Sequence, residues 1–332
     1  QQKNTLIVVP TTSLVEQMYK DFESYGWNAE TYCQKVYAGL EKEVSKSVVI
    51  TTWQSIYKLP KVYFENFEVV VGDEAHQFKS ASLVKIMTKL HQAKYRYGFT
   101  GTLDGTQTHK LVLEGLFGPS YKTIRTHELM EKGYLARLNA KIILLKHPPT
   151  AFDLYEDEIQ YLISHEQRNK FLKNLALDLK GNTLILYSRV ETHGEILYNM
   201  INNNDDRKVF FIHGKVDVEN RELAREITEK ENNAIIVASY GTFSTGINIK
   251  NLHNVIFASP SKSRIRNLQS IGRVLRKGSN KFKATLYDIA DDCSTETKRN
   301  YTLNHLFERI KIYNDENFNY DLVKVTLKEK HD

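Results

Sequence analysis

The sequence predicts an α/β protein of two tandem lobes, each with a parallel β-sheet flanked by helices. Its 332 residues exceed one ordinary domain, for which roughly 100–200 residues is usual. Short apolar runs alternate with amphipathic helical stretches along the whole chain. The runs are continuously apolar, as is typical of parallel strands that are covered on both faces. We therefore expect a first lobe at residues 1–136 and a second lobe at residues 137–332.

Strand-like runs occur in both halves of the chain. In the first half, four of them lie at residues 5–10, 47–52, 67–73 and 95–102. In the second half, six lie at residues 140–145, 182–188, 207–214, 233–239, 253–259 and 282–290. Between the runs, apolar residues recur with helical spacing, and we expect a helical tail at the C-terminus.

A helix is expected directly after the first run. Leu14, Met18 and Phe22 fall at positions i, i+4 and i+8, which places them on one helical face. Ser13 and Glu16 fit a capping box at the start of this helix.

The composition sets only broad limits on function. Lys and Arg number 46 against 40 Asp and Glu, and this excess of +6 permits a polyanionic partner without demanding one. Cys33 and Cys293 have no metal-like spacing, which fits a reducing compartment and inert core thiols. No apolar run approaches the roughly 18 residues of a membrane helix. We expect a cytoplasmic protein with no membrane partner.

Two adjacent acids, Asp73 and Glu74, follow an apolar run where a strand should end. A carboxylate pair there is costly unless a cation, a water or a ligand meets it. In a nucleotide-binding lobe, the first acid can hold Mg²⁺ through water and the second can polarise an attacking water. His76 lies just beyond and could relay the state of the nucleotide to neighbouring segments. The alternative is a solvated turn without chemistry.

A second cluster of polar residues lies near the C-terminal end of the sequence. Gln269, Arg273 and Arg276 are spaced i, i+4 and i+7, which predicts one shared helical face. Arginine suits the spread charge of a transferring γ-phosphoryl group. Residues 261–283 contain eight Lys or Arg and no acid, so this segment could also meet nucleic-acid phosphates. An ordinary basic surface helix is the alternative.

The DEAH sequence at residues 73–76 and the QxxGRxxR sequence at residues 269–276, in that order, resemble motifs II and VI of the superfamily 2 helicases. Residues 8–17 resemble motif Ia, and residues 51–55 resemble the next nucleic-acid-contacting segment. Residues 99–102, 184–189 and 237–252 resemble motifs III, IV and V. Residues 212–221 resemble the His-Gly to Arg segment. The match covers nearly the whole chain. The amino-acid sequence of the second lobe is most similar to those of the phage UvsW-type DNA helicases.

The resemblance implies two RecA-like lobes and an ATP-dependent DNA helicase or translocase that uses ATP and Mg²⁺. Its expected partner is single-stranded, forked or branched DNA, which it would unwind or branch-migrate in replication, recombination or repair. If the protein is phage-encoded, the compartment would be the host cytoplasm. An RNA helicase, or a nucleic-acid-binding module without ATPase activity, remains an alternative.

The same resemblance assigns roles to individual residues. It implies that Asp73 binds Mg²⁺ through water and that Glu74 activates the attacking water. It also implies that Arg273 and Arg276 contact the γ-phosphate. His76 and Gln269 are the other catalytic candidates in these two motifs. Gly246 and Asn248 are expected near the nucleotide, although many relatives have Asp where this chain has Asn248. The candidates for nucleic-acid contact are Pro10, Thr11, Thr12, Thr51, Thr52, His213, Gly214, Arg221 and Thr245. Hydroxyl and backbone N–H groups at strand ends suit phosphate contacts, but each threonine could instead be a helix cap.

One element of the family pattern is absent from the 332 residues. No GxxxxGK[ST] sequence occurs, although such a loop cradles phosphates in nucleotide-binding lobes. The family places this loop upstream of motif Ia. We therefore expect the first lobe to be N-terminally incomplete, without the Walker A strand and loop, and these residues alone to hydrolyse ATP poorly or not at all.

Overall fold

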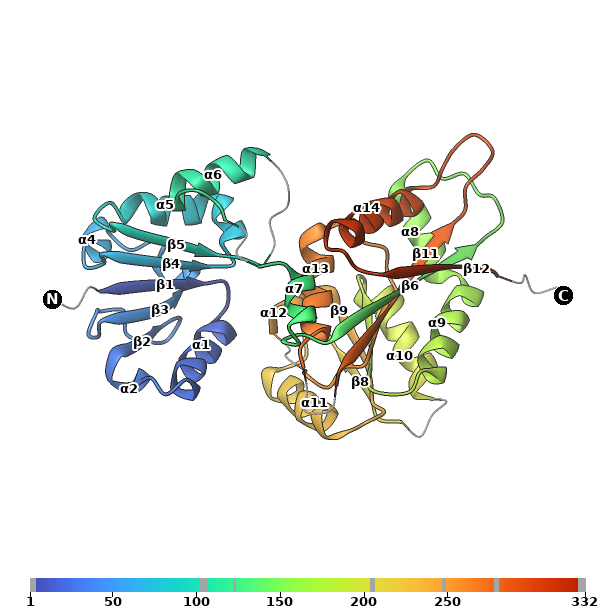
Figure 1. Cartoon of the computed structure of the whole chain (residues 1–332), viewed down its shortest axis with the longest axis horizontal. Helices are drawn as coiled ribbons and strands as arrows, with labels where there is room; N and C mark the ends of the chain where they lie inside the picture. The colour runs from blue at the N-terminus through green and yellow to red at the C-terminus, as the bar shows by residue number, and fades with distance from the viewer. Residues whose placement is uncertain are drawn as a thin grey trace. The chain divides into compact units, whose positions relative to one another are not determined.

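The computed structural model describes residues 4–101, 107–121, 124–203, 207–246, 249–277 and 281–327. The chain forms two compact units, Gln1–Lys122 and Thr123–Asp332 (Figure 1). This division lies earlier than the boundary expected after residue 136. The segment after residue 123 belongs to the second unit, where Leu135 forms an antiparallel bridge with Arg276.

The first unit has a five-stranded parallel sheet in the order β2-β3-β1-β4-β5. Its strands are β1 (Thr5–Val9), β2 (Cys33–Val36), β3 (Val48–Thr52), β4 (Val69–Asp73) and β5 (Tyr95–Phe99). Its helices are α1 (Thr12–Ser24), α2 (Ala29–Tyr32), α3 (Trp53–Ile56), α4 (Lys61–Phe64), the 3₁₀ helix η1 (Ala75–Lys79), α5 (Ala81–Lys89) and α6 (Gln107–Phe117). The sequence predicted every strand of this unit except β2.

Helix α1 begins two residues earlier than the predicted N-cap at Ser13 indicated. Its N-cap is Thr11, whose Oγ1 accepts a hydrogen bond from the backbone N–H of Leu14 at 3.3 Å. The predicted capping box of Ser13 and Glu16 is therefore wrong. The carboxylate of Glu16 instead accepts hydrogen bonds from Lys35 and Tyr37 at 2.9 and 2.6 Å, because both residues approach it from the region of β2.

The second unit has a seven-stranded parallel sheet in the order β12-β6-β11-β10-β7-β9-β8. Its strands are β6 (Arg137–Lys146), β7 (Thr183–Tyr187), β8 (Val209–Ile212), β9 (Ile235–Ser239), β10 (Asn254–Phe257), β11 (Lys283–Asp292) and β12 (Tyr320–Thr326). Its helices are α7 (Thr126–Glu131), α8 (Tyr155–Ser164), α9 (Glu166–Asp178), the π-helical turn η2 (Val190–Gly194), α10 (Glu195–Asn202), α11 (Val218–Lys230), α12 (Tyr240–Gly246), α13 (Arg264–Val274) and α14 (Tyr301–Asp315). Within the described ranges, no helix combines the length and apolar content that crossing a bilayer requires.

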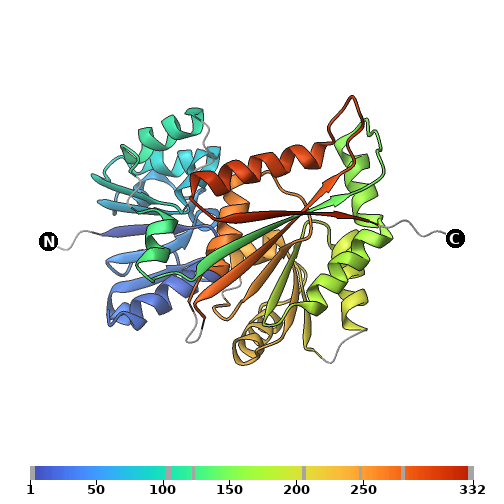
Figure 2. The ribbon, with the colours of Figure 1, turned by 45° about the vertical axis from the view of Figure 1, so that its right-hand side comes forward.

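The C-terminal part of the second unit differs from the expected helical tail. Helix α14 is present, but it is followed by strand β12, which pairs in parallel with β6 at the edge of the sheet (Figure 2). Leu322 and Val323 of β12 are 44% and 51% exposed. The strand therefore lacks the continuous burial of central strands such as β7 and β10.

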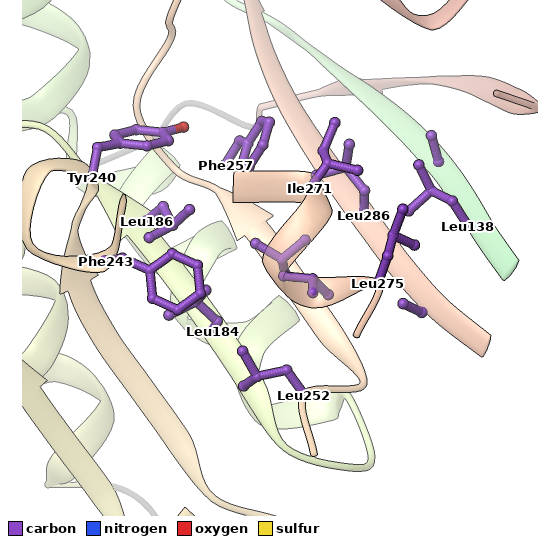
Figure 3. Close-up of a cluster of buried hydrophobic side chains, with 14 of the residues drawn as sticks. Leu138, Leu184, Leu186, Tyr240, Phe243, Leu252, Phe257, Ile271, Leu275 and Leu286 are labelled. Carbon is purple, nitrogen blue, oxygen red and sulfur yellow. The ribbon is translucent and has the colours of Figure 1, made fainter. Parts of the chain in front are cut away.

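Both faces of the second sheet are covered, as the continuous apolar runs predicted. On one face, Leu186 and Phe257 pack against Tyr240 of α12 and Ile271 of α13 (Figure 3). On the other face, the apolar residues of α9 and α10 pack against the same strands. Burying a side chain of this size stabilises the fold by roughly 1.5–3 kcal/mol. Helix α13 is thus held firmly on the sheet by its apolar face.

The two cysteines are free thiols in the core. Cys33 is 1% exposed and Cys293 is fully buried. Burial raises the pKa of the Cys33 thiol to about 11, and it also raises the pKa of Cys293. Because the thiolate is the reactive form, both side chains are unreactive at neutral pH.

Candidate functional site

The acid pair lies where the sequence placed it, at the carboxyl end of β4. Asp73 is the last residue of the strand, and Glu74 follows with φ 49° and ψ 51°, in the left-handed region. A residue other than glycine held there costs roughly 1–3 kcal/mol, and such strain concentrates at functional sites. The strained backbone turns the chain from β4 into η1 and leaves both acids at the carboxyl edge of the sheet.

The environment of Asp73 penalises its negative charge. Burial raises the pKa of Asp73 above its ordinary value, and the charge of Glu74 raises it further, while the backbone N–H of Glu74 and the side chain of His76 act in the opposite direction. A bound cation would relieve this penalty. Among the described residues, no three His, Cys, Asp or Glu side chains are grouped to hold a metal ion. The donors fit Mg²⁺, which is commonly held by one or two carboxylates together with water and phosphate oxygens.

His76 connects the acid pair to the segment that follows β5. Its Nδ1 lies 3.0 Å from Oγ1 of Thr100 and 3.2 Å from Oε2 of Glu74. One imidazole nitrogen is therefore within hydrogen-bond reach of both motifs. This contact is the geometry that a relay through His76 needs.

Two glycines allow the acid turn to pack closely on the sheet. A Cβ added to Gly72 would lie 2.7 Å from Cζ of Phe78, and one added to Gly98 would lie 3.0 Å from Cβ of Ala75. Real Cβ atoms essentially never approach another atom within 3.0 Å. Gly72 and Gly98 thus let η1 lie directly against β4 and β5.

Three nucleic-acid candidates lie at the end of β1. Because the strands of this sheet are parallel, Pro10 and Thr11 lie at the same edge as Asp73. Thr11 caps α1 through its hydroxyl, which is the structural alternative considered for a single threonine. Thr12 is exposed at the first position of α1. Of the two threonines, Thr12 has the side chain that is open to a phosphate.

The threonines at the end of β3 are less accessible than the sequence indicated. Thr51 is fully buried and Thr52 is 4% exposed. The hydroxyl of Thr51 bonds to the carbonyl of Thr52 at 3.2 Å, and the hydroxyl of Thr52 lies 2.8 Å from that of Ser55. Both hydroxyls are engaged in local structure in this conformation.

The arginine motif lies partly on α13 and partly beyond it. Gln269 and Arg273 are half-buried residues of the helix, but α13 ends at Val274. Arg276 therefore does not share the helical face, which corrects the predicted i, i+4, i+7 arrangement. At this end of the helix, the ammonium of Lys281 donates to the carbonyls of Val274 and Arg276. A lysine that satisfies the last carbonyls of a helix is a known way of ending one.

Three further candidates meet at the end of β8. His213 and Gly214 follow this strand directly, and Arg221 lies on α11. The guanidinium of Arg221 donates to the carbonyl of Gly214 at 2.8 Å. The structure thus brings the side chain of Arg221 against the loop that contains His213 and Gly214.

The remaining candidates follow β9. Gly246 is the last residue of α12. Asn248 and the side chain of Thr245 lie outside the described residues. The roles expected of these three residues stay predictions.

A set of buried charges escaped the sequence analysis. Arg168 of α9 binds Asp291, and Arg309 of α14 binds Asp288, with both acids on β11. All four side chains are at most 1% exposed. Acids inside the apolar run of β11 were a signal, because charged residues are almost never fully buried unless they are paired.

The buried imidazole of His193 predicts a pH-dependent stability. Burial and the nearby charge of Arg168 lower the pKa of His193 to about 3. In the unfolded chain the pKa is about 6.5, so the unfolded state binds more protons between these values. The stabilising contribution is full above about pH 6.5 and is lost as the pH falls towards 3. When the pH falls from 7 to 5, this group should lower the free energy of unfolding by about 2 kcal/mol.

We therefore expect His193→Asn to lose about 2 kcal/mol less stability than the parent protein between pH 7 and pH 5. Urea unfolding at both pH values measures the difference. His91→Asn, at an exposed position of the first unit, is the matched control. An equal loss in the parent and in His193→Asn would contradict the burial of a neutral imidazole.

Comparisons with known proteins agree with this fold and motif order. Residues 1–105 match the family described as "Type III restriction enzyme, res subunit", and residues 167–278 match the "Helicase conserved C-terminal domain". A structure of a type I restriction enzyme HsdR fragment from Vibrio vulnificus has a TM-score of 0.69 at 17% identity, covering 98% of this chain and 58% of that one. The fold and the ordered motifs define a core of two RecA-like units, the class of the superfamily 2 helicases.

Sequence identity defines the family more closely. The chain is 36% identical over 344 residues to the ATP-dependent DNA helicase uvsW of Enterobacteria phage T4, covering 97% of this chain and 68% of the phage protein. The crystal structure of T4 UvsW matches with a TM-score of 0.51 and 34% identity, over 98% of this chain and 68% of that one. The chain belongs to the UvsW-like ATP-dependent DNA helicases of superfamily 2.

A more distant relative bears on the substrate. A protein of Acanthamoeba polyphaga mimivirus, provisionally named as an ATP-dependent RNA helicase, is 26% identical over 343 residues, covering 99% of this chain and 62% of the relative. The chain spans about two thirds of the length of the curated relatives it matches, 68% and 62% for these two.

Proposed function

We propose that this chain is the motor of an ATP-dependent helicase or translocase that unwinds or branch-migrates forked and junction DNA. The observation that carries the proposal is a strained acid pair at the carboxyl edge of a parallel sheet, in a chain 36% identical to a named DNA helicase. Ligands of open parallel sheets bind at this edge. A protein that only bound nucleic acid would have no physical need for a half-buried Asp73 beside a left-handed Glu74.

The proposal assigns the chemistry to side chains of both units. Asp73 holds Mg²⁺ through water, and Glu74 accepts a proton from the attacking water. When bound there, Mg²⁺ would neutralise charge on the phosphates of ATP. Arg273 and Arg276 stabilise the charge that develops on the γ-phosphoryl group.

His76 and Gln269 belong to the same catalytic set in the proposal, and Gly246 and Asn248 lie near the nucleotide. The contact of His76 with Thr100 supports a relay from the acid pair to the following segment. This relay gives the motor a route by which the state of the nucleotide reaches the rest of the first unit.

Nucleic acid is bound mainly through its backbone in this proposal. Thr12, the backbone after β1, the loop of His213 and Gly214, and Arg221 of α11 supply hydroxyl, N–H and basic groups near strand ends. Such groups position a strand without reading its bases. A structure-selective rather than sequence-selective helicase needs contacts of this kind.

One experiment separates the candidate functions. ATP hydrolysis by the intact protein is measured with single-stranded DNA, blunt duplex, forked DNA and single-stranded RNA side by side, together with strand separation of the duplex and the fork. We expect DNA to stimulate hydrolysis more than RNA does, and forks to be unwound faster than blunt duplex. Equal or greater stimulation by RNA would identify an RNA helicase. Binding without hydrolysis on every substrate would identify a binding module.

A further inference from the structure

The loop at residues 258–263, between β10 and α13, accepts hydrogen bonds from three buried side chains. Its Ala258 carbonyl accepts from Arg168 at 2.8 Å, and its Ser259 carbonyl accepts from the hydroxyl of Tyr240 at 3.1 Å. Its Ser261 carbonyl accepts from Arg309 at 3.2 Å. We call this segment the β10–α13 loop. Each of these donors comes from a different helix, so the loop is fixed from several directions.

Arg168 reaches the loop from the face of the sheet that α9 covers. Its guanidinium binds both carboxylate oxygens of Asp291, at 2.8 and 2.9 Å, and has an N–H left for Ala258. Burial alone would raise the pKa of Asp291, but Arg168 and His147 lower it below its ordinary value. The carboxylate is therefore ionised, and it keeps the guanidinium in one orientation.

Arg309 reaches the loop from the opposite face. It binds Asp288 at 2.8 Å, and the same carboxylate accepts from the hydroxyl of Tyr313 at 2.7 Å. Asp288 and Asp291 are an odd number of residues apart on β11, so their side chains point to opposite faces of the sheet. One guanidinium from each face of the sheet thus donates to a carbonyl of the β10–α13 loop.

The far end of α13 is held by a third buried cation. Lys281 is 2% exposed, and its ammonium donates to the carbonyls of Val274, Arg276 and Lys250, the last two at 2.9 and 3.1 Å. Burial lowers the pKa of Lys281 to about 8. The segment with Arg273 and Arg276 is therefore fixed where it begins and where it ends.

Stability alone does not explain this arrangement. Burying a charge costs free energy that pairing only partly returns, and apolar side chains of similar volume often stabilise a fold as well or better. Buried charges are more useful where a backbone must occupy one position. A displacement of about 1 Å in a catalytic group can cost 10²-fold in rate.

We propose that Arg168, Arg309 and Lys281 are positioning residues that fix both ends of the segment carrying Arg273 and Arg276. This inference rests on the proposed function, because it assigns these cations an effect on ATP hydrolysis through Arg273 and Arg276. The three residues act on the backbone and not on the reacting atoms.

The first test is Arg309→Lys in the intact protein, since lysine keeps the charge but lacks the fork that serves Asp288 and Ser261 together. We expect kcat for ATP hydrolysis to fall about tenfold, with KM for ATP and affinity for single-stranded DNA within twofold. The matched control is Arg207→Lys, because Arg207 also donates to backbone carbonyls, including those of Asn233 and Leu179 at 2.7 and 2.9 Å. Those carbonyls lie at the amino edge of the sheet, and this control should keep kcat within twofold.

A double-mutant cycle then separates positioning from general stability. In an Arg273→Ala background, Arg309→Lys should cause a smaller further loss of kcat than in the parent, because one of the two arginines that it positions is already gone. An equal loss with and without Arg273 would overturn the inference. If Arg273→Ala itself leaves kcat unchanged, the proposed function of Arg273 fails, and the inference fails with it. If Arg273→Ala lowers kcat but Arg309→Lys does not, only the inference fails.

A milder substitution tests the same inference in case Arg309→Lys does not fold. Tyr240→Phe removes only the hydroxyl that donates to Ser259, and it keeps the ring in the apolar cluster of Figure 3. We expect a twofold to fivefold lower kcat with the melting temperature nearly unchanged, and a smaller effect in the Arg273→Ala background. Parent-like kcat in a folded Tyr240→Phe protein would count against a positioned loop.

Discussion

Glu74→Gln should abolish ATP hydrolysis in the intact protein while ATP and DNA binding persist. Glutamine keeps the size of the side chain and one oxygen, but its amide cannot accept a proton from the attacking water. Loss of a general base typically costs 10²- to 10⁴-fold in rate. The backbone at this position is left-handed, and glutamine has the same branching at Cβ as glutamate, so the turn should be preserved. Steady-state phosphate release measures the effect.

Binding measurements make this test specific. ATP and single-stranded DNA should bind Glu74→Gln with affinities within a few-fold of the parent protein. Glu41→Gln, at an exposed loop position of the same unit, is the matched control and should hydrolyse ATP normally. Undiminished turnover in Glu74→Gln would remove Glu74 from the chemistry and leave the strained turn without a catalytic explanation.

Arg273→Ala should lower kcat by about 10³-fold or more, the scale found for an arginine that stabilises a transferring γ-phosphoryl group. Arg273→Lys should recover only part of the loss, since an ammonium lacks the planar fork of a guanidinium. Single-turnover hydrolysis with saturating ATP separates this effect from nucleotide binding.

The control for this experiment is another arginine of the second unit. Arg225 on α11 forms ion pairs with Glu222 and Glu226 at the surface, and Arg225→Ala should keep kcat within twofold. A drop of tenfold or less in Arg273→Ala would return α13 to the simpler interpretation of a basic surface helix.

The strands were predictable where burial left a local signature. The runs that became β1 and β3 are buried on both faces, so their apolar residues are consecutive in the sequence. Strand β2 has polar residues at its two central positions, and β12 is largely exposed at the edge of the sheet. Neither could be found by the rule that found the others.

The site was predictable in residue type more than in surroundings. The DEAH and QxxGRxxR patterns placed Asp73 and Arg273 correctly at a strand end and on a helix. The ammonium of Lys281 donates to the carbonyl of Arg276 just beyond the end of α13, and the pairing of Arg168 with Asp291 joins residues far apart in the chain. Contacts between residues that are distant in the sequence produce no periodic pattern. The sequence also does not indicate that a hydroxyl such as that of Thr51 is buried.

The strand order of the second unit affects how the protein is made. Strand β6 is the first of this unit to leave the ribosome, yet its neighbours β11 and β12 are the last. Since synthesis proceeds at roughly 5–20 residues per second, β6 remains unpaired along both of its edges for many seconds. A nascent chain stalled before residue 320 should therefore expose a long apolar strand, and it should be the species that chaperones bind or that aggregates during synthesis.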